Sequence, residues 1–303
     1  AMRLIGYLVV GLLLTVVSVD RPAVASICEG QDITDTVKET FKVRPGGTLH
    51  IELDYGNIEV VTSSGDRVVV ELERTVRVRD EDEARSILDR YHEYAIEQDG
   101  DDVSVESRYQ AGGSRWGGNN RNHLKIRVKV EVPFDYNVEF ESGAGNVDVG
   151  RLEGDVSGKT GAGNITMERV MGTIDITTGA GNIAIEGGSN HVDVNTGAGN
   201  VDLRDVEGSV RANTGAGNIT AYIVRQPEED SRLETGAGNV TVFLDNAAGV
   251  YVDAVASMGS ASCDFELEVK GKWMTKSFEG EINGGGPDLF MRAGVGNVSL
   301  RRR

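Results

Sequence analysis

The pentapeptide TGAGN recurs through the middle of the chain at a fixed spacing. Full copies begin at Thr160, Thr178, Thr196, Thr214 and Thr235, and a near copy, SGAGN, begins at Ser142. The first five of these six starts follow an 18-residue period without a slip. A fixed period of this kind is typical of solenoids, in which each repeat contacts only its neighbours.

The 18-residue unit places apolar residues where short strands need them. With the Thr as column 0, apolar residues stand in columns 2, 5, 7, 10, 14 and 16. In one copy these are Ala162, Ile165, Met167, Val170, Ile174 and Ile176. Alternation within columns 5–7 and 14–16 is strand periodicity, and each unit offers two or three strands that cannot bury their inner faces alone. The repeat therefore predicts an all-β parallel β-solenoid with coils stacked about 4.8 Å apart.

The left-handed hexapeptide helix of acyltransferases is another solenoid with an 18-residue coil. That architecture needs an aliphatic residue at every sixth position. The apolar spacings in this chain run 3, 2, 3, 4, 2 and 4, so they close at one full unit without repeating at six. This pattern excludes the hexapeptide helix.

The GAGN segment is interpreted as a structural corner. Its glycines permit positive φ, and its Ala fits where two faces of the coil converge. The Asn side chains are expected to stack into a ladder that bonds the coils above and below. The ladder residues are Asn146, Asn164, Asn182, Asn200, Asn218, Asn239 and Asn297, and the column-0 threonines form a companion ladder. A phosphate loop would add a Lys and a helix, and a calcium repeat would add aspartates inside the turn. The repeat contains neither feature, which favours the structural interpretation.

Weaker matches extend the coil in both directions. DYGNIEV at 54–60 is a degenerate early copy, Phe278–Ile282 repeats the unit's L-x-G-x-V element, and residues 293–300 close the series. The unit that begins at Thr214 is stretched to a 21-residue length by the charged loop QPEED. Cys263 falls in column 7, so a buried thiol is expected there rather than a disulfide to Cys28. The sequence LRRR at the C-terminus is expected to place three charges at the open end and to discourage end-to-end growth.

The first half of the chain divides into three parts before the repeats of residues 142–303. Residues 1–25 have the pattern of a secretory signal: Met2-Arg3, an apolar run, and Ala23-Val24-Ala25 before the cleavage point. Residues 26–44 form a leader, and residues 45–141 form a β-rich part with one short helix near 81–92. The expected location is the periplasm, cell envelope or exterior. The alternative is an uncleaved helix that tethers the chain to the membrane.

Composition narrows the function classes. The formal net charge is −17, which disfavours binding to nucleic acids or anionic lipid, so no tight membrane association is expected after signal cleavage. The four histidines are scattered, and no GxSxG motif is present. The sequence therefore predicts no metal, no cofactor and no nucleophilic serine site.

Two groups of residues are candidates for a site. Trp116, with Arg115 and Arg121 in the Gly/Asn-rich loop 110–122, has the character of a sugar-stacking group, although such a Trp also packs onto apolar edges. Asp175 and Asp193 are expected to stack, with Asp202 and Arg211 on the neighbouring coil. Such a carboxylate cluster is what a carbohydrate-active β-helix enzyme would use. No aromatic residue is identified on the outer faces of the repeat coils, which favours binding over catalysis.

These residues together resemble a known family. The runs GNIEV, VEVP, the serial [ST]GAGN[VI] copies and the closing segment FEGEINGGGPDLFMRAGVGNVSL are similar to a bacterial domain-of-unknown-function family described as "putative adhesin", with β-strand repeats. The resemblance covers roughly residues 40–300. It implies a right-handed β-solenoid on an exported envelope protein, and it supplies no catalytic residues.

The expected function is therefore that of a non-catalytic exported cell-envelope protein. Its repetitive solenoid would act as an adhesin or as a binding scaffold, monomeric or weakly associating. A glycan or another envelope protein is the expected partner. A polysaccharide lyase or glycosidase-like β-helix is the alternative.

Overall fold

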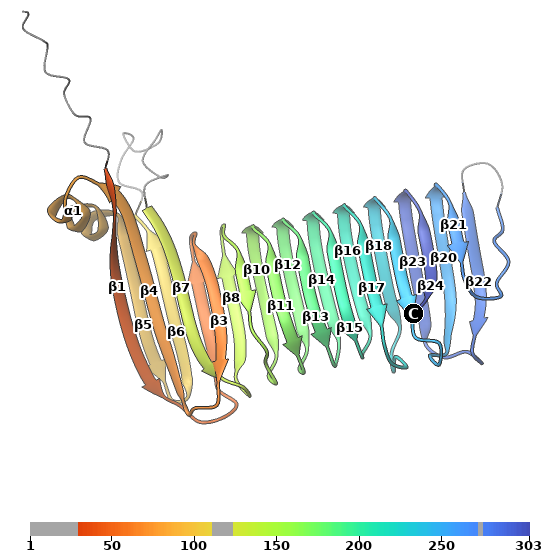
Figure 1. Cartoon of the computed structure of the whole chain (residues 1–303), viewed down its shortest axis with the longest axis horizontal. Helices are drawn as coiled ribbons and strands as arrows, with labels where there is room; N and C mark the ends of the chain where they lie inside the picture. Colours follow the sequence, from red (N-terminus) through yellow and green to blue (C-terminus); the bar gives the residue numbers. More distant parts are fainter. Residues whose placement is uncertain (1–29, 111–123, 272–274) are drawn as a thin grey trace, which may run out of the picture.

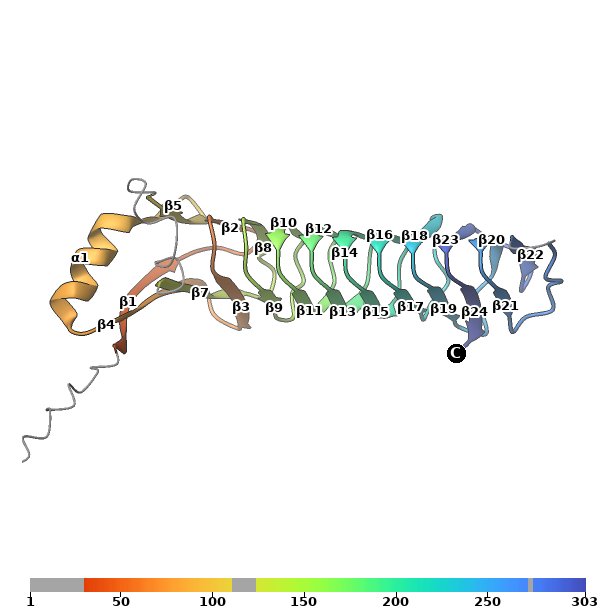
Figure 2. The ribbon, with the colours of Figure 1, turned by 90° about the horizontal axis from the view of Figure 1, so that it is seen from above.

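The computed structural model describes residues 30–110, 124–271 and 275–303 (Figure 1). Two sheets of 12 strands each lie face to face along an elongated body (Figure 2). In spatial order, sheet A contains β1 (Gln31–Lys42), β4 (Arg67–Val78), β7 (Leu124–Pro133), β3 (Asn57–Ser63), β9 (Val147–Val149), β11 (Ile165–Val170), β13 (Ile183–Gly188), β15 (Val201–Val206), β17 (Ile219–Ile223), β19 (Val240–Leu244), β24 (Val298–Arg302) and β21 (Ala261–Cys263). Sheet B contains β5 (His92–Asp99), β6 (Asp102–Tyr109), β2 (Thr48–Leu53), β8 (Asn137–Ser142), β10 (Val156–Ala162), β12 (Ile174–Ala180), β14 (Val192–Ala198), β16 (Val210–Ala216), β18 (Ser231–Ala237), β23 (Asp288–Val295), β20 (Val250–Met258) and β22 (Lys276–Ile282).

Each repeat coil contributes one strand to each sheet. Neighbouring coils pair in parallel with like residues over like, as in Thr160 beside Thr178 and Ile165 beside Ile183. Two strands per coil, not three, are enough because the glycine corners reverse the chain between the sheets. The predicted parallel β-solenoid is confirmed.

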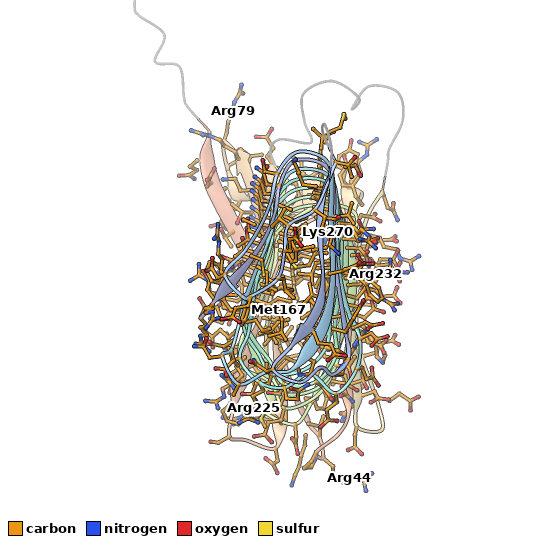
Figure 3. All side chains as sticks on the ribbon, turned by 90° about the vertical axis from the view of Figure 1, so that its right-hand side faces the viewer. Arg44, Arg79, Met167, Arg225, Arg232 and Lys270 are labelled. Atoms are coloured by element: carbon orange, nitrogen blue, oxygen red, sulfur yellow. The ribbon has the colours of Figure 1, made fainter. Side chains whose placement is uncertain are left out.

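The core is a continuous column between the two sheets. Columns 5, 7, 10, 14 and 16 point inward, and Ile165, Met167 and Ile176 are fully buried. Figure 3, viewed along the solenoid, shows Met167 inside the coil and Arg232 on an outer face. Column 2 is the exception among the apolar columns, because Ala162 is exposed. Thr160, with 4% of its surface exposed, fills the inside of that corner instead.

Helix α1 (Glu81–Tyr91) lies where the sequence predicts it and covers the N-terminal end. The Asp80 side chain accepts a hydrogen bond from the Glu83 N–H, which caps the helix. Ala84, Leu88 and Tyr91 are buried. The helix connects β4 of sheet A to β5 of sheet B, so it spans the gap between the sheets (Figure 2).

The N-terminal third continues the same two sheets. The coil β2–β3 stacks directly on β8–β9, and β6 and β7 flank it on its other side. Within the segment 26–44, expected as a leader, Gln31–Lys42 form β1, which pairs antiparallel with β4 along its whole length. Ile33, Val37 and Phe41 alternate along β1 and pack against the core, which explains why this segment is a strand.

The C-terminal coils are not stacked in chain order. The last coil, β23–β24, inserts between β18–β19 and β20–β21. The interpretation of Phe278–Ile282 as a coil element is wrong, since it lies in β22, which runs antiparallel to β20. Phe278 is still buried, because strand periodicity fixes the buried face and not the strand direction.

Two further expectations about this end are corrected by the same insertion. The LRRR terminus does not lie at the open end: Arg301 pairs with Asp264, and Arg303 pairs with Asp205. Phe265 and Leu267, which follow β21, pack against the end of the core instead. Cys263 is half-buried and free rather than buried, because β21 is the edge strand of sheet A. Partial burial still raises the pKa of its thiol.

No helix within residues 30–110, 124–271 or 275–303 combines the length and apolar character needed to cross a lipid bilayer.

Candidate binding surface

The Asn residues of the TGAGN corners are joined in one hydrogen-bonded series. The backbone N–H of Asn182 donates to the Asn164 side-chain oxygen at 2.9 Å. One coil further on, the N–H of Asn200 donates to the Asn182 side-chain oxygen at 2.8 Å. The same bond recurs from Asn57, in the degenerate copy, to Ser260. The predicted ladder residues Asn146, Asn164, Asn182, Asn200, Asn218, Asn239 and Asn297 all lie in this series. Their oxygens thus bond the next coil, which makes the corner a structural element.

The column-0 threonines bond backbone rather than one another. The hydroxyl of Thr196 donates to the Gly181 carbonyl at 3.0 Å, and that of Thr214 donates to the Gly199 carbonyl at 2.9 Å. Each hydroxyl therefore satisfies a carbonyl at the buried inside of a corner.

A second ladder, missed in the sequence, runs along the opposite corner of the coil. The Asn137 side-chain oxygen accepts from the Asp155 N–H at 3.0 Å, and the Asp155 carboxylate accepts from the Thr173 N–H at 2.7 Å. One coil further on, His191 Nδ1 lies 2.7 Å from Ser209 Oγ. This His–Ser contact lies in the same corner column as Asn137, Asp155 and Thr173, and it joins two neighbouring coils.

The stretched repeat forms a polar hollow beside this second ladder. The hollow, of about 260 Å³, is lined by His191, Ser209, Glu207 and the loop that contains QPEED. Glu207 is paired with both Arg169 and Arg225 at 2.9 Å. Gln226 fixes the loop by bonding the N–H and the carbonyl of Gly249. The loop is therefore held against the coil instead of projecting from it.

The structure separates the four residues of the expected acidic patch. Asp175, Asp193 and Arg211 are neighbours on β12, β14 and β16, with Arg211 3.9 Å from Asp193. Asp202 lies on β15 of the opposite sheet and pairs with Arg204. The expected cluster of four is wrong, because columns 6 and 15 fall on different sheets when each coil has two strands.

A shallow acidic groove crosses the outer face of sheet B. Its volume is about 440 Å³, and its lining includes His50, Glu52, Glu139, Glu141 and Asp175. His50 Nδ1 lies 3.0 Å from a Glu139 carboxylate oxygen. The groove lies over β6, β2, β8, β10 and β12, where the rows of outward side chains are mostly carboxylates.

Aromatic side chains do occur on the outer faces, which corrects the sequence interpretation. Tyr222 on β17 and Phe243 on β19 are cross-strand partners on sheet A, with ring centroids 4.4 Å apart and planes inclined by 5°. On sheet B, the Arg232 guanidinium lies 4.8 Å from the centroid of the Phe290 ring. The missed signal was strand alternation: Ala221 and Val242 are fully buried, so the residues that follow them point outward.

Arginine partners lower the pKa of carboxyl groups on and near these faces. A hydrogen bond from Arg127 lowers the pKa of Glu59, and Arg44 does the same to Asp101. Arg301 lowers the pKa of Asp264. These three groups are therefore held in the charged form.

Trp116, Arg115 and Arg121 lie outside the described residues, as do the signal segment 1–25 and Cys28. Within the described ranges, no group of three or more His, Cys, Asp or Glu side chains has an arrangement that could hold a metal ion.

Several solved structures are similar to this chain. One is a "putative adhesin" from Bacteroides fragilis, with 12% identity and a TM-score of 0.47, covering 89% of this chain and 97% of that one. Another is a "putative cell adhesion protein" from Clostridium sporogenes, with 12% identity and a TM-score of 0.29, covering 89% and 100%. A "putative adhesin" from Parabacteroides distasonis has 12% identity and a TM-score of 0.36, covering 89% and 97%.

No curated protein matches this chain at a significant level. The family model described as Toastrack DUF4097 matches residues 48–285, which span the two sheets from β2 to β22. That range covers well over half of the chain. The protein belongs to the Toastrack DUF4097 family.

Proposed function

We propose that this chain is a non-catalytic exported cell-envelope protein whose solenoid is a binding or scaffold surface of the adhesin kind. One observation carries the proposal: outward side chains stand in straight rows across successive coils, in register from strand to strand. A surface of this kind offers the same contact many times along one line. That arrangement suits multivalent attachment to an extended partner, such as a glycan chain or another envelope protein.

At three carboxyl groups the electrostatics oppose the role of a general acid. A glycosidase needs a general acid whose pKa is raised, paired with a second carboxylate. Glu59, Asp101 and Asp264 have pKa values displaced downward by arginine, which is the opposite direction. Outward arginines are also held in ion pairs, such as Arg292 with Asp253.

Export and a contact from the segment 110–122 are parts of the same proposal. The signal pattern of residues 1–25 supports a periplasmic, envelope or extracellular location, with tethering by an uncleaved helix as the alternative. Trp116, Arg115 and Arg121 are proposed to add contacts to the partner. A Trp beside arginines can stack against a sugar ring.

A carbohydrate-active enzyme is the second candidate, favoured by the groove on sheet B. There the carboxylates of Glu139, Glu141 and Asp175 surround a hollow large enough for a sugar residue. The two candidates differ in whether a bound polysaccharide is cleaved.

The test is cosedimentation of the purified protein with isolated bacterial envelopes, with a parallel assay of released sugars. We expect saturable binding and no time-dependent release of reducing or unsaturated ends from envelope polysaccharides or polyuronates. An Asp175→Asn variant serves as the control, because it alters the groove at one atom and should change neither result. Steady product release that Asp175→Asn abolishes would establish the enzyme and refute the proposal.

A further inference from the structure

Two aromatic rings interrupt the polar rows of sheet A. Tyr222 and Phe243 are half-buried and stacked nearly parallel across adjacent strands. Because the rings lie face to face along the direction in which the strands stack, their edges are turned toward solvent. The edge of an aromatic ring carries partial positive charge and attracts oxygen lone pairs.

A row of hydroxyl groups runs beside the rings. Thr220, Thr241, Ser299 and Ser262 are neighbours in register across β17, β19, β24 and β21. The strands that carry them are about 4.8 Å apart, and the Ser299 and Ser262 hydroxyls lie 2.9 Å apart and share a hydrogen bond. Each hydroxyl can donate one hydrogen bond and accept two. The row is thus a line of hydroxyl donors and acceptors, one on each of four neighbouring strands.

The charges at either end of the aromatic pair cancel. Arg204 pairs with Asp202 at 2.9 Å, and Arg301 pairs with Asp264 at 2.7 Å. The guanidinium groups remain partly exposed and keep N–H donors for neutral oxygen atoms. The surface therefore offers hydrogen bonds without net charge, on a chain whose formal charge of −17 repels polyanions.

We infer that this aromatic–hydroxyl surface, made of Thr220, Tyr222, Thr241, Phe243 and Ser299, binds an extended uncharged polysaccharide. The inference rests on the proposed function and names its surface and its partner class. Such a polymer has oxygen atoms that can contact the ring edges and the guanidinium groups. It also has hydroxyl groups at regular intervals that can form hydrogen bonds with the Thr/Ser row. A polyuronate would bring charge that the arginines, already neutralised, cannot balance.

The test is electrophoresis in native gels that contain hydroxyethyl cellulose, dextran or polygalacturonate. We expect at least one uncharged polymer to retard the protein and polygalacturonate to leave its mobility unchanged. The double variant Tyr222→Ser/Phe243→Ser should weaken the retarding affinity at least tenfold. Phe290→Ser is the matched control, because it also removes an outward ring, but from sheet B; it should stay within twofold of the unmodified chain. Thermal unfolding of both variants checks that each is folded.

The outcomes separate this inference from the function on which it rests. Undiminished retardation of the folded double variant, or retardation by polygalacturonate alone, would overturn the inference. Binding to envelopes without binding to either uncharged polymer would overturn the partner class and leave the proposed function standing. If the protein binds neither envelopes nor the uncharged polymers, both the inference and the proposed function are wrong.

Discussion

Replacing Gly181 with alanine should destabilise the protein by about 3–5 kcal/mol, because two separate penalties act at that position. Gly181 has a φ of +152°, which side chains with a Cβ rarely adopt. A Cβ there would also lie 2.0 Å from the Gly163 carbonyl oxygen of the preceding coil. That oxygen is main chain within a stack of paired strands, so it cannot move aside without disturbing the coils.

Gly46 supplies the matched control for this substitution. Its φ is +83°, but a Cβ would meet nothing within 4 Å. Gly46→Ala therefore carries only the conformational penalty and should lower the free energy of unfolding by about 1 kcal/mol. Urea unfolding of the two variants measures the difference. Equal losses would show that close coil-to-coil approach does not explain the glycines of TGAGN.

The second large effect is a loss of stability when the solution is acidified, and it comes from one buried histidine. His92, at the end of α1, is 4% exposed, and its Nε2 lies 2.8 Å from the Ser107 hydroxyl. Its Nδ1 is buried without a hydrogen-bond partner. Burial, reinforced by the positive charge of Arg74 and opposed by Asp54, lowers the pKa of His92 to about 4.

Stability should therefore fall as the solution is acidified. The unfolded chain takes up a proton on this histidine near pH 6.5, whereas the folded chain does so only near pH 4. Between these values the unfolded state binds more protons, so stability present above pH 6.5 is lost as pH decreases toward 4. We expect this group to remove about 2 kcal/mol between about pH 7 and about pH 4.5.

His92→Gln isolates this effect from the protonation of carboxylates. Glutamine can bond Ser107 but does not titrate, so carboxylates contribute equally to both proteins. The test is to measure the unfolding free energy of wild type and variant in urea at several pH values. Between about pH 7 and about pH 4.5 the wild type should lose about 2 kcal/mol more than the variant. A difference that is constant with pH would contradict a buried neutral histidine.

The repeat predicted the coil because stacking forces like residues over like. Once Thr160 and Thr178 share a column, the parallel register of Ile165 with Ile183 follows. Strand direction did not follow, since alternation in Phe278–Ile282 is the same in either direction. Stacking order did not follow either, because β23–β24 matches the column pattern as well as β20–β21 does and can fit at more than one level.

The candidate surfaces were less predictable because they depend on which sheet each column joins. Asp202 and Asp193 look adjacent in an alignment of the repeats, yet they face opposite directions across the solenoid. The second corner ladder was hidden because Asn137 and Asp155 fill one structural role with different residue types. Tyr222 and Phe243 were detectable from their alternation with buried neighbours, but their contact depends on the extra length of the stretched repeat being absorbed in a loop.

Deletion of residues 179–196 tests most directly the central claim, that the repeat is an interchangeable architectural unit rather than a site. This one-unit deletion joins Thr178 to Gly197 and restores an intact TGAGN. The backbone N–H of Asn200 can then donate to the Asn164 side-chain oxygen, which accepts from the N–H of Asn182 in the full chain. The shorter deletion of 181–196 is the control, because it removes less than one unit and shifts every later column. We predict that the one-unit deletion unfolds cooperatively within a few degrees of the full chain and keeps its binding to envelopes, while the shorter deletion does not fold. Equal damage by both deletions, or loss of binding in a folded one-unit deletion, would contradict the account.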